Sequence, residues 1–352
     1  MKQNKMSLAT FFDRYIPPLE EEMRTVVHTA DPRYAGLFGM LRYHMGWADA
    51  AFNPRPGRSG KRVRPVLCLL ICEACGGNWE LALPAGAAIE LMHNFTLIHD
   101  DIEDQDNMRR GRPTAWVLWG KAQGINAGDT LFALAHLALA QLSERAVPPQ
   151  TVLSALRLFD STCVTLTSGQ YLDIGFESRV DVPVTDYLTM IEGKTAALVA
   201  CACELGALIA AAPELSTSSG HRPQREHLHS FGHHLGMAFQ MHDDVLGIWG
   251  DPTLTGKPVG GDIARRKKSL PILHGLERSA ELRELLMRET VSSTDIDYAK
   301  KLLQETGSRE YTERLAREHH DRALAALDAT SLQGPAAQAL LELAQALLGR
   351  ER

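Results

Sequence analysis

The sequence predicts an all-α fold, a single domain over residues 1–352 built as a many-helix bundle, and three observations predict it. Ala and Leu, which favour helices, supply much of the 45% of residues that are hydrophobic. Segments rich in Val, Ile and Thr, which favour strands, are few. Apolar side chains recur at helical spacing through most of the chain, and strands do not alternate with helices along it.

We expect helices wherever this spacing holds and breaks where Gly, Pro and polar residues cluster. The expected helices are Val66–Cys75, Leu81–Asp101, Asn126–Glu144, Thr151–Tyr171, Val184–Ala212, Arg225–Ile248 and the C-terminal segment. The expected breaks are Pro54–Gly60, Arg110–Pro113, Val147–Pro149, Glu214–Pro223 and Asp251–Gly261. None of these breaks is long enough to be a domain linker, and both ends of the chain are expected to complete the bundle without carrying chemistry.

Composition and charge exclude several classes of protein. The net charge of −6 leaves no basic excess, so we expect no nucleic-acid partner. The N-terminus lacks a secretory apolar stretch, and the most apolar segment, Ala196–Ala212, contains Glu204 and is too short to cross a bilayer. We therefore expect no transmembrane segment and a cytoplasmic protein. Cys68, Cys72 and Cys75 lie in an apolar run without a zinc-finger pair, so they are interpreted as reduced core residues.

The most informative segment is ELMHNFTLIHDDIEDQDNMRRGRPTAW. On a helix, Asp100 and Asp104 lie one turn apart on one face, with Asp101 beside them. Because this cluster continues an apolar run, its carboxylates are partly buried, and burying several of them without a cation is costly. Mg²⁺ prefers oxygen ligands, and the adjoining Arg109 and Arg110 suit phosphate oxygens. The segment therefore predicts a magnesium-dependent diphosphate site.

A second acidic helix end follows later in the chain. Asp243 and Asp244 end an amphipathic helix, and Lys257 and Lys267 come after them. Two acidic helix ends, each followed by cations, predict two halves of one site in which Mg²⁺ ions bridge carboxylates to a diphosphate. Asp251 is a further candidate ligand if the helix extends that far.

Other basic positions are ambiguous from their residue types alone. Lys61, Arg62 and Arg64 form a basic turn, which is typical of a solvated surface but also of an anion site. Lys194 begins an apolar helix, where it either snorkels to solvent or binds a ligand. His93 precedes the first acidic cluster by about two turns and is either a core residue or a ligand-binding one.

Five ordered motifs resemble those of the trans-isoprenyl diphosphate synthases, the polyprenyl synthetase family. They are GKRVRP, DDIED with RRGRPT, GQYLDI, EGKTA, and FQMHDDVLGIWGD with GKPVGGDI and KKSLP, and they cover a core from about residue 57 to 271. The resemblance implies an all-α bundle around a deep central cavity, a homodimer, and isopentenyl and allylic diphosphates as substrates. In such a reaction the allylic diphosphate leaves and isopentenyl diphosphate adds, which gives a trans chain five carbons longer.

The resemblance also implies roles for particular residues. The implied catalytic residues are Asp100, Asp101, Asp104, Asp243, Asp244 and Lys194. Mg²⁺, three ions per active site, is expected on Asp100, Asp101, Asp104 and Asp243. Positions for isopentenyl diphosphate are Gly60, Lys61, Arg64, His93 and Arg110. Positions around the allylic diphosphate are Arg109, Lys194, Thr195, Gln240, Lys257 and Lys267, and Gln170 and Asp173 line the reaction zone.

Two positions depart from the family pattern. The second aspartate-rich motif often ends in Asp, but its fifth position here is Gly247. The Gly that often precedes the later lysine is replaced by Arg266. Both departures concern the second motif and leave the first whole.

Product length is predicted from the residues before the first motif. Phe95 lies five residues before Asp100 and the small Thr96 lies four before it, a pattern that resembles geranylgeranyl (C20) synthases. A farnesyl (C15) or longer product is the alternative. Alternatives of another class are a non-catalytic partner subunit of a prenyl synthase and a class I terpene cyclase, and turnover by the purified chain separates the first of these from an enzyme.

Overall fold

The computed structural model describes residues 7–56, 60–179, 181–212, 221–251, 260–288 and 290–348, with the backbone alone for residues 221–223 and 348. In its first half the helices are α1 Leu8–Val26, α2 Ala35–His44, α3 Val63–Ala74, α4 Leu83–Glu103, α5 Ala115–Trp119, α6 Lys121–Ala140 and α7 Pro149–Glu177. The later helices are α8 Val184–Ile191, α9 Ala197–Ala210, α10 His221–Trp249, α12 Gly261–Ala264, α13 Leu270–Arg278, α14 Ala280–Leu286, α15 Ser293–Glu305, α16 Ser308–Ala329 and α17 Pro335–Leu348.

Short elements join these helices. Three 3₁₀ turns, Pro32–Tyr34, Trp79–Ala82 and Gln141–Glu144, and one π-helical turn, Glu192–Ala196, lie between them. The strands of the described ranges are two-residue segments, β1 Met108–Arg109 and β2 Arg112–Pro113, paired as an antiparallel hairpin. The all-α prediction is therefore confirmed.

The chain forms two compact units that interleave along the sequence. The first unit comprises Met1–Asp160, Cys201–Glu226 and Leu332–Glu342, and the second comprises Ser161–Ala200, His227–Ser331 and Leu343–Arg352. Helices α7, α9, α10 and α17 contribute residues to both units. The expectation of a single domain stays a prediction.

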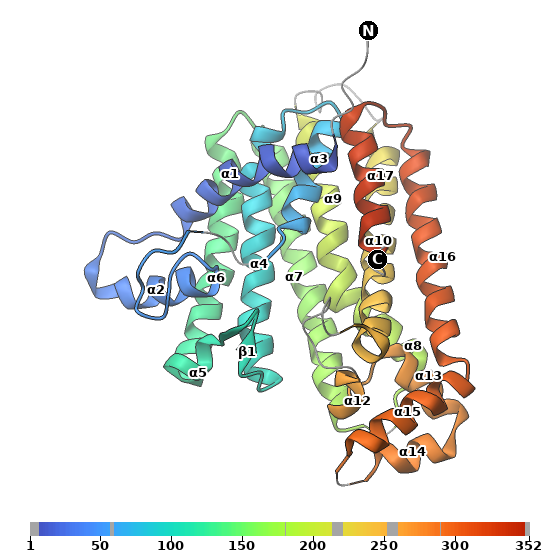
Figure 1. The fold of residues 1–352 in the computed structure, drawn as a ribbon. Helices are drawn as coiled ribbons and strands as arrows, with labels where there is room; N and C mark the ends of the chain where they lie inside the picture. Colours follow the sequence, from blue (N-terminus) through green and yellow to red (C-terminus); the bar gives the residue numbers. More distant parts are fainter. Residues whose placement is uncertain are drawn as a thin grey trace. The chain divides into compact units, whose positions relative to one another are not determined.

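In the first unit, α4 packs against α1, α3 and α6 (Figure 1). The run Pro65–Cys72 on α3 is buried, and so is Leu83–Met92 on α4, which explains why neither segment shows a polar face. Small residues allow close packing here, since a Cβ at Gly206 would lie 2.4 Å from the carbonyl oxygen of Cys68. The six cysteines are free, and Cys75 alone among them is not fully buried, so the prediction of core cysteines holds.

In the second unit, α13 packs against α8, α14, α15 and α16. One buried apolar cluster lies around Tyr187, Met237 and Leu270, and another around Ile248, Ile272 and Leu303. These clusters hold the carboxyl-terminal part of α10 in place.

Two helical segments are long and apolar enough to cross a bilayer by length and composition. They are Trp79–Glu103 and Val184–Ala210, and 72% of the apolar stretch in each is buried inside the protein. Buried core helices of globular proteins have the same composition, so the two segments are weak evidence for a membrane span.

The main difference from the predicted helices concerns Val184–Ala212. The structure divides this segment into α8, the π-helical turn Glu192–Ala196 and α9. A residue inserted into a helix in this way often marks a functional position.

Candidate active site

The polar residues singled out in the sequence gather into two clusters, one in each unit. The first cluster comprises Gly60, Lys61, Arg64, His93, Asp100, Asp101, Asp104, Arg109 and Arg110. The second cluster comprises Gln170, Asp173, Lys194, Thr195, Gln240, Asp243, Asp244 and Lys267, joined by Tyr187 and Asp262. Lys257 lies outside the described residues.

The carboxylates of the first cluster stand at the carboxyl end of α4. The backbone N–H of Asp104 caps the helix by donating to the carbonyl oxygen of Asp100 at 2.8 Å. The last turn of α4 carries no basic residue, so these carboxylates face the negative end of the helix dipole. This arrangement favours a cation from elsewhere.

Asp101 is the buried member of this group, with a relative exposure of 2%. Its Oδ1 accepts a hydrogen bond from Nε of Arg109 at 2.6 Å, while its buried Oδ2 has no hydrogen-bond partner among the described residues. Burial raises the pKa of the Asp101 carboxyl to about 6, although Arg109 lowers it, and Asp106 and Asp100 raise it further. One carboxylate oxygen is thus left without a compensating group.

The hairpin after α4 contains three arginines, Arg109, Arg110 and Arg112, and each makes different contacts. Arg110 and Gly111 form its two-residue turn, with φ values of 52° and 73°, as a type I′ hairpin turn requires. Arg112 donates to the carbonyl oxygens of Tyr43 and Ala48, so it anchors the hairpin. The guanidinium of Arg110 lies against Gly60, where a Cβ would be 3.0 Å from Nη2.

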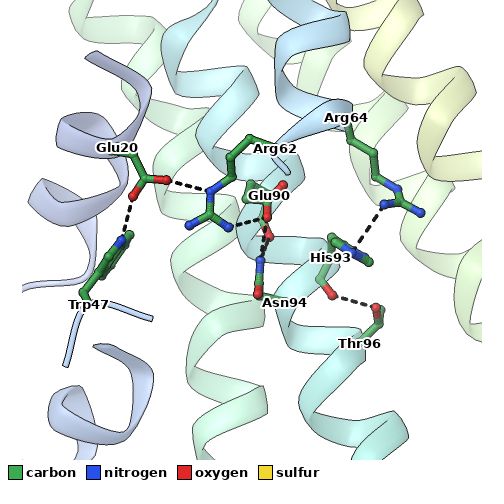
Figure 2. Close-up of polar contacts among 8 residues, drawn as sticks. All are labelled: Glu20, Trp47, Arg62, Arg64, Glu90, His93, Asn94 and Thr96. Atoms are coloured by element: carbon green, nitrogen blue, oxygen red, sulfur yellow. Dashed lines mark hydrogen bonds and ion pairs between the residues drawn. The ribbon is translucent and has the colours of Figure 1, made fainter. Parts of the chain in front are cut away.

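Arg64 and His93 form the remaining part of the first cluster (Figure 2). Nη1 of Arg64 lies 3.3 Å from Nε2 of His93, and within the part of the chain that the structure describes the buried Nε of Arg64 has no hydrogen-bond partner. Burial, together with the charges of Arg64, Arg110 and Arg109, lowers the pKa of His93 well below its usual range. The ring is therefore neutral, and the guanidinium groups around it favour an anion.

His44, at the end of α2, is a residue that sequence reasoning missed. Burial and the charges of Arg110 and Arg109 lower its pKa to about 3, and its buried Nε2 has no hydrogen-bond partner. A lone histidine in a segment without a motif gives no signal in the sequence.

The two positions predicted to set product length, Phe95 and Thr96, lie five and four residues before Asp100 on α4, just over one helical turn. The ring of Phe95 contacts that of His99 at 4.8 Å and that of Phe132, on α6, at 5.1 Å between centroids. The hydroxyl of Thr96 donates a hydrogen bond to the carbonyl oxygen of His93 at 2.8 Å. The side chain of Phe95 thus lies where α4 packs against α6.

Asp244 is the buried centre of the second cluster. It accepts hydrogen bonds from the hydroxyl of Tyr187, from Nε2 of Gln240 at 3.0 Å and from the backbone N–H of Leu270 at 3.1 Å. Burial raises the pKa of Asp244 to about 6, although Lys267 and these hydrogen bonds lower it. Tyr187 was not predicted, because it lies 57 residues before Asp244 in no motif.

Two glycines bring the GQYLD and EGKTA motifs together. A Cβ at Gly169 would lie 2.2 Å from the backbone nitrogen of Lys194, and one at Gly193 would lie 2.8 Å from the carbonyl oxygen of Thr165. This backbone contact between α7 and the π-helical turn places Nζ of Lys194 2.5 Å from Oδ2 of Asp173.

The same turn connects to α10 through side chains. Thr195 donates to Oε1 of Gln240 at 2.9 Å, and Gln240 in turn donates to Asp244. Burial opposes the charge on Lys267, but four carboxylates raise its pKa above the usual range, namely Asp262, Asp244, Asp173 and Asp243. The second cluster therefore holds lysines among carboxylates.

The missing aspartate at Gly247 has a packing explanation. A Cβ at this position would lie 2.4 Å from Oδ2 of Asp262, whose side chain is buried. The carboxylate of Asp262 therefore lies where a side chain at position 247 would start. Helix α10 ends at Trp249, so Asp251 stands beyond it as an exposed residue and the condition for its acting as a ligand is not met.

Three comparisons with known proteins agree with each other. Residues 47–303 match the polyprenyl synthetase family. The chain is 42% identical over 296 residues to a geranylgeranyl diphosphate synthase of Mycobacterium tuberculosis, with 83% of this chain and 81% of the relative covered. It is 39% identical over 337 residues to a (2E,6E)-farnesyl diphosphate synthase of the same species, with 94% and 89% covered. A polyprenyl synthetase from Streptomyces coelicolor matches the structure with a TM-score of 0.86 and 36% identity, over 97% of this chain and 100% of that one.

Proposed function

This chain belongs to the polyprenyl synthetase family and is a prenyltransferase, and from that premise we propose that its product is geranylgeranyl diphosphate (C20). The substrates are isopentenyl diphosphate and a shorter allylic diphosphate. The observation that carries the assignment of these substrates is the first cluster, where the charges of Arg64 and Arg110 act on a neutral His93, and the buried Asp101 lies about two turns further along α4. Guanidinium groups suit a diphosphate, because they form charge-assisted hydrogen bonds to its oxygens.

The basic residues of the two clusters have different proposed roles. Lys61, Arg64 and Arg110 bind the diphosphate of isopentenyl diphosphate, and neutral His93 orients Arg64. Lys194 and Lys267 neutralise the allylic diphosphate as negative charge develops on it during departure. The double bond of isopentenyl diphosphate then adds to the allylic carbon, and the departing diphosphate takes the proton that is lost, so no protein nucleophile is required.

The carboxylates fit a divalent cation, which we propose is Mg²⁺, three ions per active site. In the described ranges the buried Oδ2 of Asp101 has no hydrogen-bond partner, and Asp100 and Asp104 lie beside Asp101 at the end of α4. Within the described ranges no three His, Cys, Asp or Glu side chains form a ready-made metal site. That agrees with the way Mg²⁺ binds, through one or two carboxylates together with waters and substrate phosphates.

Asp100, Asp101 and Asp104 in the first cluster and Asp243 in the second would hold these ions. When bound, Mg²⁺ supplies positive charge that stabilises a leaving diphosphate. We expect Asp100→Ala or Asp104→Ala to lower turnover by about two orders of magnitude or more, because removing one electrostatic stabiliser costs roughly that much. Circular dichroism should show an unchanged fold, and near-normal turnover in either variant would contradict the metal assignment.

The C20 product is supported by Phe95 with Thr96 after it, and by the relative named geranylgeranyl diphosphate synthase. The related farnesyl diphosphate synthase makes C15 the alternative. The test is to incubate the purified chain with Mg²⁺, labelled isopentenyl diphosphate and dimethylallyl, geranyl or farnesyl diphosphate in separate reactions. A C20 product supports the proposal, C15 or longer corrects it, and no product in any reaction supports a non-catalytic subunit.

We also propose that the chain is a cytoplasmic homodimer. Helix α6 exposes Ile125 and Leu137, and α7 exposes Val164 and Tyr171, at 47%, 60%, 66% and 77% of their surfaces. Large apolar side chains that a helix exposes to solvent suit a protein interface. Free cysteines are consistent with a reducing compartment. Light scattering that gives the mass of one chain would contradict the dimer.

A further inference from the structure

The three cations of the GKRVRP motif have different surroundings. Lys61 is exposed, and Arg64 faces His93 (Figure 2). Arg62, between them, has a side chain with 0% exposure. One basic run in the sequence therefore contains a buried arginine whose function is separate from that of its neighbours.

Two carboxylates from different helices hold Arg62. Nε donates to Glu20 on α1 at 2.7 Å, and Nη1 donates to Glu90 on α4 at 2.6 Å (Figure 2). The second oxygen of Glu20 accepts from Nε1 of Trp47 at 2.6 Å, and Oε1 of Glu90 also accepts from Asn94 at 3.0 Å. Two negative charges face one positive charge, so Arg62 is unsuited to bind a further anion itself.

The backbone at Arg62 is unusual for an arginine. Its φ of 56° and ψ of 31° lie in the left-handed region, which residues other than Gly enter at a cost. Arg62 is the residue immediately before α3, which begins at Val63. Such a conformation persists only where the surroundings hold it, and here the bonds to Glu20 and Glu90 do so.

A second contact between an arginine of this motif and α4 lies about one turn further along that helix. Glu90 and His93 are three residues apart on this helix, so they lie on one face, and they contact Arg62 and Arg64 respectively. The Arg62–Glu90 pair therefore fixes the start of α3 on α4 next to the Arg64–His93 contact. A change in the backbone at Arg62 would move Lys61 and Arg64 together.

We propose that Arg62 is a positioning residue for isopentenyl diphosphate: held by Glu20 and Glu90, it fixes the backbone from which Lys61 and Arg64 meet the diphosphate. The N-terminal helix α1 thus contributes to substrate binding through Glu20, without contacting substrate. This inference rests on the proposed function of the first cluster.

The test compares Glu20→Gln with a matched control, Glu73→Gln. Glu73 lies in the last turn of α3 and binds Arg14 and Tyr15, so it also joins α1 to α3, but at the far end of α3 from Arg62. Calorimetry measures the binding of isopentenyl diphosphate without an allylic substrate, so no turnover occurs. We expect Glu20→Gln to weaken binding about tenfold, as the loss of one charged hydrogen bond would, and Glu73→Gln to leave it unchanged.

Steady-state kinetics distinguish a role of Arg62 in positioning Lys61 and Arg64 from a general loss of stability. In Glu20→Gln and Arg62→Lys the KM for isopentenyl diphosphate should rise, while the KM for the allylic diphosphate stays unchanged. Trp47→Phe keeps the Glu20–Arg62 pair and removes the donor to Glu20 together with one ring of a buried side chain, so it should change the same KM in the same direction by less.

Three outcomes would overturn the proposal. Equal effects of Glu20→Gln and Glu73→Gln on isopentenyl diphosphate binding would assign both pairs to general stability. If the unmodified chain binds no isopentenyl diphosphate, the proposed function fails together with this inference, whereas normal binding that is unchanged in Glu20→Gln overturns the role of Arg62 alone.

Discussion

Gly247 has no room for a side chain, because the buried carboxylate of Asp262 lies 2.4 Å from where a Cβ would stand. Adding atoms to a packed site costs about 1–3 kcal/mol, and a second carboxylate adds repulsion. We therefore expect Gly247→Asp, which restores the aspartate common in the family, to lower both Tm and turnover. Thermal unfolding and steady-state assays with Mg²⁺ measure the two effects.

Gly175, on α7, is the matched control for this substitution. A Cβ there would meet no atom within 4 Å, so Gly175→Ala should stabilise the helix by up to about 1 kcal/mol and leave turnover unchanged. A gain of activity in Gly247→Asp would show that the second motif lacks a ligand and that packing against Asp262 does not explain the glycine.

The residues that sequence reasoning found are those whose signal is local. Asp101 and Arg109 are eight residues apart, and an acidic run followed by arginines predicted that both belong to one site, although not that they form an ion pair with each other. Tyr187 meets Asp244 across 57 residues, and Arg62 meets Glu20 across 42. Such pairings depend on how helices pack, so a sequence without aligned relatives contains no sign of them.

A pair of histidines joins α10 to α16. Nδ1 of His234 lies 3.0 Å from Nδ1 of His319, and the charges facing this pair come from His233, Arg322 and Glu318. Burial, then His233 and His319, lowers the pKa of His234 to about 4, and burial also lowers that of His319. Protonation of both rings would place like charges in contact.

The lowered pKa values of His234 and His319 determine how the stability of the protein changes with pH. A free histidine has a pKa of about 6.5, so between that pH and about 4 the unfolded chain binds more protons than the folded one. The stabilising contribution of the pair is present above this window and is lost as the pH falls through it. We expect the Tm to fall between pH 7 and pH 5, and to fall less in His319→Gln. The exposed His227→Gln is the control, and an identical pH dependence in His319→Gln would contradict the assignment.

Contact between α4 and α6 bears on product length. Phe95 packs against Phe132 across the two helices, and a shortened side chain on either would leave space in the same place. We expect Phe95→Ala to lengthen the product beyond that of the unmodified enzyme, and Phe132→Ala to do so to a smaller extent. Chromatography of the dephosphorylated products measures chain length.

Phe12→Ala provides the control, because this half-buried phenylalanine lies on α1 and is not one of the rings, His99 and Phe132, that the ring of Phe95 contacts among the described residues. Its product should be unchanged even if its stability falls. An unchanged product in Phe95→Ala would mean that another residue limits the chain.

Helices were predictable where their apolar spacing is regular, as in Leu81–Asp101, which the structure gives as α4 Leu83–Glu103. The π-helical turn Glu192–Ala196 was not, because it depends on the backbone of α7 reaching Gly193 from another part of the chain. An apolar run alone predicts a continuous helix there.

At the scale of the whole molecule, composition and spacing predicted the all-α class, because nearly every apolar run has helical period. They did not predict two compact units, because the apolar segment Val184–Ala212 was expected to be one helix. In the structure its residues up to 200 belong to one unit and its residues from 201 belong to the other. The N-terminal segment was expected to carry no chemistry, yet its Glu20 holds Arg62. The burial of that pair becomes visible only once α1, α3 and α4 are packed together.

The stability of the whole chain should depend on metal and diphosphate together. Among the described residues, Oδ2 of Asp101 and Nε of Arg64 have no hydrogen-bond partner, so a metal and a diphosphate have groups to bind in the folded state. A ligand that binds only the folded state raises the free energy of unfolding of the protein. At 100 times Kd this amounts to about 2.7 kcal/mol, roughly several degrees in Tm. We expect inorganic diphosphate with Mg²⁺ to give that shift in differential scanning fluorimetry, and EDTA to abolish it. Asp100→Ala should lose the shift while Glu73→Gln keeps it, and an equal shift in the presence of EDTA would show that the cations of the chain bind diphosphate without any metal.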